Sequence, residues 1–103
     1  MALLQISKKE LQIWIENQRD FLLVDVREQE EHAYYNIGGE LVPLSELTNH
    51  LTKFDTDKPV VFYCQKGIRS LIAIQRLQKK YPDGKFYNLT SGIQGAESIS
   101  HSE

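Results

Sequence analysis

The only cysteine of the chain lies in a segment whose residue types favour a reactive thiolate. Cys64 ends an apolar run and precedes a helical apolar pattern. Gly67 lets the backbone curl tightly, so that successive amides can point inward as an anion-binding nest, and the following helix adds the positive end of its dipole. The loop predicted to surround the sulfur comprises Gln65, Lys66, Gly67, Ile68, Arg69 and Ser70. Lys66 and Arg69 add full positive charges to it.

These features favour the thiolate over the thiol. A free cysteine has a pKa of about 8.5 and is only slightly ionised at neutral pH. Lowering that pKa by about two units requires about 2.7 kcal/mol of differential stabilisation, which a helix end, a nest and a nearby cation can supply together. The alternative is a structural role, in which a buried cysteine only fills space in the core. Because Cys64 is followed by polar and glycine residues, we expect a nucleophile with a depressed pKa instead.

The elements that must hold this loop follow from two alternating periods in the sequence. Pro59 opens the clearest strand, over 60–63, and apolar residues at helical spacing predict a helix from Ile68 onward. Further strands are expected over 3–6, 21–26, 41–42 and 85–87. Three other helices are predicted: one opened by a Ser7–Glu10 capping box, a short one over 28–35, and one capped by Ser45.

Strands that alternate with helices imply an α/β fold, with a short parallel sheet of about five strands and helices on both faces. Ligands of such folds bind beyond the carboxyl ends of the strands. Cys64 follows the 60–63 strand directly, so it is expected at that edge of the sheet.

The bulk properties limit the class of protein. The chain has 103 residues and a formal charge of −2, which indicates one domain, expected over 1–96 with a flexible tail over 97–103, and argues against a nucleic-acid partner. No apolar run approaches the roughly 20 residues of a membrane span. One cysteine excludes an intrachain disulfide, so we expect a reducing, cytoplasmic compartment.

Two motifs of the sequence resemble those of rhodanese-like domains, and the similarity covers nearly the whole chain. The first runs over 22–31 as Leu-Leu-Val-Asp-Val-Arg-Glu-Gln-Glu-Glu, followed by Ile-Gly-Gly at 37–39 and Val-Pro-Leu at 42–44. The second, over 60–70, contains the Cys-x-x-Gly-x-Arg-Ser pattern of the family's active-site loop. The segment Tyr-Asn-Leu at 87–89, followed by Gly-Ile at 92–93, is similar to the family's closing segment.

The resemblance implies a sulfurtransferase that works without a metal or cofactor. Cys64 would take a sulfane sulfur from thiosulfate or a protein persulfide and pass it to a thiophilic acceptor through a covalent persulfide. The amides of 65–70 would cradle that persulfide. Asp25 and Arg27 would hold the pocket wall without reacting. Lys66 and Arg69 would either bind the anionic group of the donor or remain solvated.

Two segments depart from the usual family pattern. Where family members commonly read Gly-His-Ile-Pro-Gly-Ala, this chain has Tyr-Asn-Ile-Gly-Gly-Glu over 35–40. That variant resembles rhodanese domains that work with adenylating enzymes, and it favours a protein persulfide or a sulfur-carrier protein as partner. The closing segment also lacks the tryptophan common in the family, which leaves the packing of the last helix open.

Two other function classes remain as alternatives. One is a cysteine phosphatase, but those enzymes place five residues between the cysteine and the arginine, whereas four separate Cys64 from Arg69. The other is a low-turnover shuttle or docking module that serves an adenylating enzyme. His32, His50 and His101 show no metal-binding spacing, so we expect surface histidines.

Overall fold

The computed structural model describes residues 3–94, which form one parallel sheet with helices on both of its faces. The strands are β1 (Leu4–Ile6), β2 (Leu22–Asp25), β3 (Glu40–Leu41), β4 (Val60–Tyr63) and β5 (Phe86–Leu89). The helices are α1 (Lys8–Glu16), α2 (Gln29–Tyr34), the 3-10 helix η1 (Leu44–Phe54) and α3 (Ile68–Lys80). The strand order is β1-β5-β4-β2-β3, which confirms the predicted α/β class. The expected tail over 97–103 lies outside the described residues.

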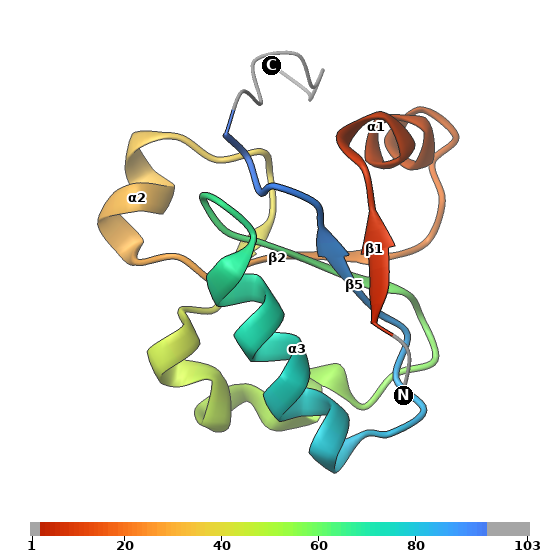
Figure 1. Ribbon diagram of the computed structural model, residues 1–103, viewed down its shortest axis with the longest axis vertical. Helices are drawn as coiled ribbons and strands as arrows, with labels where there is room; N and C mark the ends of the chain where they lie inside the picture. The colour runs from red at the N-terminus through yellow and green to blue at the C-terminus, as the bar shows by residue number, and fades with distance from the viewer. Residues whose placement is uncertain (1–2, 95–103) are drawn as a thin grey trace.

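Strand β4 lies at the centre of the sheet and is buried on both faces. Val60 and Phe62 contact the layer formed by α3 and η1, and the side chain of Cys64 continues the same row. Val61 and Tyr63 point to the opposite face, where α1 packs. Figure 1 shows α3 and η1 together on one side of the sheet and α1 on the other. The two-residue period of a strand therefore assigns Cys64 to the α3 face.

Two predicted helix caps had different outcomes. The capping box is confirmed, because the Glu10 amide donates to Ser7 Oγ at 3.0 Å and the Ser7 amide donates to Glu10 Oε1 at 2.9 Å. The cap at Ser45 is wrong: η1 begins at Leu44, behind Pro43. The physical reason is that the Leu44 amide still donates to the Val26 carbonyl at 3.0 Å, so the chain turns into the helix as soon as it leaves the sheet.

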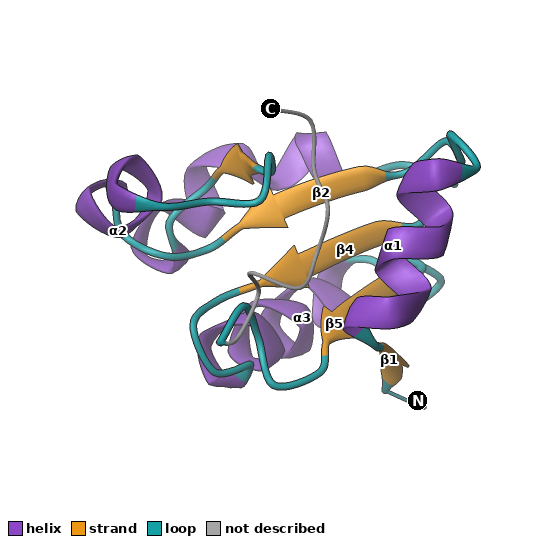
Figure 2. Ribbon diagram, turned by 90° about the horizontal axis from the view of Figure 1, so that it is seen from above, coloured by secondary structure: helices purple, strands orange, loops and turns teal. Residues whose placement is uncertain are grey.

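The carboxyl ends of the central strands meet α2. Figure 2 shows the arrowheads of β2 and β4 pointing toward this helix. The loop that follows β4 leads into α3 at the same edge, as expected for a parallel sheet. None of the helices within residues 3–94 is long and apolar enough to cross a membrane.

Candidate active site

Cys64 follows β4 directly and forms the floor of an open pocket. The residue is 1% exposed. The pocket has a volume of about 250 Å³ and is lined by Glu31, Cys64, Gln65, Lys66, Ile68 and Arg69. The structure thus brings five of the seven predicted loop residues around one cavity and adds Glu31 from α2.

The sulfur atom accepts hydrogen bonds from its own loop. The amides of Gly67 and Ser70 donate to Sγ at 3.1 and 3.4 Å, and the Ser70 hydroxyl lies 3.4 Å from it. Burial raises the pKa of the Cys64 thiol, but hydrogen bonds from the Ser70 hydroxyl and from the amides of Ser70, Gly67 and Lys66 together hold that pKa below its ordinary value. A depressed pKa increases the thiolate fraction at neutral pH.

Gly67 gives the loop its shape. It is the N-cap residue of α3 and has φ +92°, in the left-handed region that a residue with a Cβ rarely adopts. A Cβ here would also lie 3.3 Å from the Ser91 amide nitrogen. Glycine therefore lets the chain reverse between the sulfur and α3, and it leaves room for the turn after β5 to pack against the loop.

A turn after β5 is hydrogen-bonded to the backbone of the Cys64 loop. The amides of Ile93 and Gln94 donate to the carbonyls of Cys64 and Gln65 at 3.0 and 3.1 Å. Gly92 has φ +65°, and a Cβ on it would lie 2.3 Å from the Cys64 carbonyl oxygen. The sequence analysis assigned no role to Gly92; its place in the closing segment was the available signal.

Asp25 and Arg27 form a buried ion pair beside the site. Their side chains are 0% and 3% exposed. Arg27 Nε and Nη2 donate to the two carboxylate oxygens at 3.0 and 2.9 Å, and Nη2 also donates to the Tyr35 carbonyl. Burial lowers the pKa of Arg27, but the Asp25 carboxylate outweighs it and keeps that pKa above its ordinary value. The pair ties the end of β2 to the chain that leaves α2.

His32 joins this pair, which the sequence analysis did not expect. Its Nδ1 atom lies 2.9 Å from Asp25 Oδ2, and its side chain is only 24% exposed, so it is not a simple surface histidine. The signal for it was weak, because only the orientation of α2 brings position 32 back to the end of β2. His101 lies outside the described residues. Within residues 3–94 no group of histidine, cysteine, aspartate and glutamate side chains could hold a metal ion.

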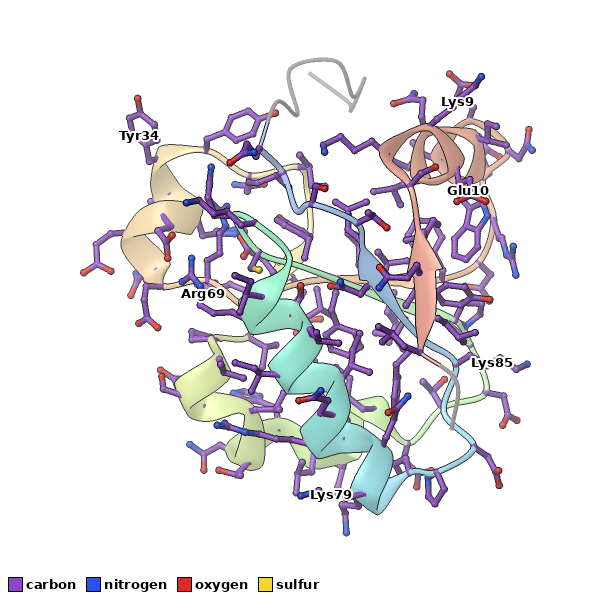
Figure 3. The ribbon with its side chains drawn as sticks, in the orientation of Figure 1. Lys9, Glu10, Tyr34, Arg69, Lys79 and Lys85 are labelled. Carbon is purple, nitrogen blue, oxygen red and sulfur yellow. The ribbon has the colours of Figure 1, made fainter. Side chains whose placement is uncertain are left out.

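Arg69 is held by a carboxylate from α2. Its Nη1 and Nη2 atoms donate to Glu31 Oε1 and Oε2 at 2.7 and 2.9 Å, and each of the two side chains is 35% exposed. The hydrogen bonds from Arg69 are the main cause that lowers the pKa of Glu31 to about 2. Figure 3 shows Arg69 at the start of α3, beside α2. Sequence reasoning left Arg69 solvated or facing a donor and did not identify Glu31 as its partner.

A row of hydrogen-bonded polar side chains connects the surroundings of the sulfur with strands β5 and β1. The Ser70 hydroxyl also faces Asn88 Oδ1, which is an alternative acceptor to Sγ for its single proton, and Asn88 Nδ2 donates to Gln5 Oε1 at 3.3 Å. Asn88 lies on β5 and is 5% exposed. Because a buried amide needs partners, Asn88 fixes the orientation of Ser70 and, through it, the surroundings of Cys64.

The chain is similar to known proteins in both sequence and fold. The sequence profile of the Rhodanese-like domain matches residues 7–98. The chain belongs to the rhodanese-like family. The structure of a rhodanese-like domain protein from Staphylococcus aureus superposes with a TM-score of 0.81 at 22% identity, over 98% of this chain and 100% of that one. The human single-domain sulfurtransferase TSTD1 superposes with a TM-score of 0.74 at 29% identity, over 96% and 100% of the two chains.

Sequence relatives of this rhodanese-like domain include proteins of different sizes. The uncharacterized protein YqhL of Bacillus subtilis is 40% identical over 73 residues, which are 70% of this chain and 57% of that protein. The probable adenylyltransferase/sulfurtransferase MoeZ of Mycobacterium tuberculosis is 34% identical over 77 residues, or 72% of this chain and 20% of that protein. The thiosulfate sulfurtransferase GlpE of Coxiella burnetii is 34% identical over 86 residues, or 82% and 79% of the two chains. The chain thus spans little more than half of the first relative and a fifth of the second.

Proposed function

We propose that this rhodanese-like domain is a sulfurtransferase and that Cys64 carries the transferred sulfur. The thiolate attacks the sulfane sulfur of a donor, a new S–S bond forms, and the donor's own S–S bond breaks. With thiosulfate as donor, sulfite leaves with the electron pair of that bond. The Cys64 persulfide then gives its outer sulfur to a cyanide or thiol acceptor, which restores the thiolate.

The observation that carries this proposal is the set of hydrogen bonds at Sγ. Two loop amides and a hydroxyl surround a sulfur that forms the floor of an open pocket. They favour a thiolate for the attack, and the other amides of 65–70 are suited to hold the anionic outer sulfur afterwards. Asp25 and Arg27 take no part in the bond changes and keep the pocket wall in place. The reaction needs no metal or cofactor, and a reducing compartment such as the cytoplasm suits a free thiolate.

The relatives support a protein partner as a second version of the same chemistry. MoeZ carries both adenylyltransferase and sulfurtransferase in its name, and its similarity to this chain covers 72% of the present sequence. Ile68, at the mouth of the pocket, is 64% exposed, which suits contact with a protein surface. In this version the domain shuttles sulfur between a protein persulfide and an adenylating enzyme or sulfur carrier, and turns over slowly alone.

Thiocyanate formation tests the proposal. Purified protein is mixed with thiosulfate or a thiol persulfide as donor and cyanide as acceptor, beside the Cys64→Ser variant. Transfer from at least one donor that is lost in Cys64→Ser is expected. Activity that persists without the thiol, or hydrolysis of an aryl phosphate that depends on Cys64, would contradict the proposal, the second result in favour of a phosphatase.

A further inference from the structure

The ion pair between Glu31 and Arg69 changes the charge that a donor meets at the pocket. Both residues line the cavity above the sulfur. The guanidinium faces both carboxylate oxygens, at 2.7 and 2.9 Å, so its bidentate donor edge is already occupied. Glu28, at the N-cap of α2, adds a second carboxylate whose field also acts on Arg69.

This arrangement is unfavourable for thiosulfate. Thiosulfate is a dianion whose SO3 end offers pairs of negatively charged oxygens, and a free guanidinium binds such pairs in bidentate fashion. Here a dianion would have to displace Glu31, or approach with the carboxylate beside it. Because the pKa of Glu31 is held at about 2, the carboxylate stays ionised throughout the neutral range and the repulsion persists. Lys66 lines the same pocket but offers only a point charge on a flexible stem.

From this geometry we infer that Glu31 is a specificity-determining residue: paired with Arg69, it selects donors whose sulfane sulfur is carried on a thiol and disfavours the thiosulfate dianion. The inference rests on the proposed function and names the donor class for it. With a thiol persulfide as donor, Cys64 takes the outer sulfur and a thiolate leaves, so no sulfonate needs to be bound. Glu31 acts through Arg69 and through its own charge, and it takes no part in the bond changes.

The test compares two donors in three proteins. The donors are thiosulfate and 2-hydroxyethyl persulfide, which carries sulfane sulfur but neither a sulfonate nor a charged amine. The proteins are the wild type, Glu31→Gln, and the control Glu30→Gln, which removes the same charge from an exposed position of the same helix. Glutamine keeps the shape of Glu31 and one acceptor for Arg69, so the substitution isolates the charge. Rates are measured as kcat/KM at low and high ionic strength, and sulfur loading of Cys64 is followed by intact mass.

We expect Glu31→Gln to raise kcat/KM for thiosulfate about fivefold, with a clearly smaller change for 2-hydroxyethyl persulfide, since one partly exposed charge next to a dianion has an effect of that order. The gain shrinks at high salt, and Glu30→Gln shows less than half of it. Parallel losses with both donors would show that Glu31 only supports the fold, and would overturn the inference while leaving the sulfurtransferase proposal intact. If neither donor loads Cys64 of the wild type with sulfur, the proposed function itself is overturned.

Discussion

Removing the charge of Asp25 is expected to destabilise the fold strongly. The carboxylate is 0% exposed and pairs with a guanidinium that is 3% exposed. In Asp25→Asn, the side-chain amide would turn one donor toward Arg27, which has only donors, and the guanidinium would remain buried without its counter-charge. Breaking a buried pair in this way costs about 3–5 kcal/mol. A domain of this size has a total stability of about 5–15 kcal/mol, so the loss is a large fraction of it.

The double variant Asp25→Asn/Arg27→Met is the matched control. It also removes the buried cation, and the asparagine oxygen can still accept from the Arg27 backbone amide, which donates to Asp25 Oδ1 at 2.9 Å. Replacement of both charges by neutral groups is often close to neutral in stability. We therefore expect the double variant to recover at least about 2 kcal/mol relative to Asp25→Asn.

Urea unfolding followed by fluorescence measures both effects. With a slope of about 1–3 kcal/mol per molar urea, a loss of about 3–5 kcal/mol moves the midpoint by about 1 M or more. The reasoning is refuted if Asp25→Asn costs less than about 1 kcal/mol, or if the double variant is no more stable than Asp25→Asn.

Three further outcomes follow from the loop and its supports. Ser70→Ala removes a hydrogen bond that lowers the pKa of Cys64, so the pH profile of iodoacetamide alkylation should move to higher pH; an unchanged profile would contradict this. Gly92→Ala should cost at least about 2 kcal/mol more than Gly38→Ala in urea unfolding, because both have positive φ but only Gly92 has a carbonyl oxygen 2.3 Å from the new Cβ; equal losses would argue against close packing of the turn after β5 on the Cys64 loop. The pKa of Glu31 is lowered from 4.5 to about 2, so its stabilisation should be complete above pH 4.5 and disappear as the pH falls toward 2; a stability difference between wild type and Glu31→Gln that does not change over that range would refute it.

The sequence was most informative where structure is determined locally. The run 60–63 and the apolar spacing after Ile68 predicted β4 and α3, because period two and period 3.6 differ clearly over short windows. The Ser7–Glu10 capping box was predictable for the same reason, since its two hydrogen bonds join residues three apart. Ser45 shows the limit of local reasoning: a good capping residue had no such role, because pairing of the chain with Val26 had already fixed the start of the helix.

The parts of the site that were missed depend on contacts distant in sequence. Glu31 and Arg69 are 38 residues apart, and Ser70 and Asn88 are 18 apart. The sequence around Arg69 and Ser70 does not indicate which carboxylate or which amide the fold brings to the loop. Gly92 was visible as a glycine, but the need for it arises only when the turn after β5 packs against the carbonyl of Cys64. The position of Cys64 after β4 and at the start of the loop was therefore predictable, while the contacts that residues of other elements make with this loop were not.

The most direct test of the central claim is intact mass spectrometry after brief incubation with a sulfane-sulfur donor and removal of excess donor. Thiosulfate and a thiol persulfide are each used, with Cys64→Ser as control. The proposed function predicts a gain of one sulfur atom from at least one donor, which is lost on addition of cyanide and absent in Cys64→Ser. A wild-type mass that stays unchanged with both donors, or a gain that persists in Cys64→Ser, would contradict the assignment of Cys64 as the sulfur carrier.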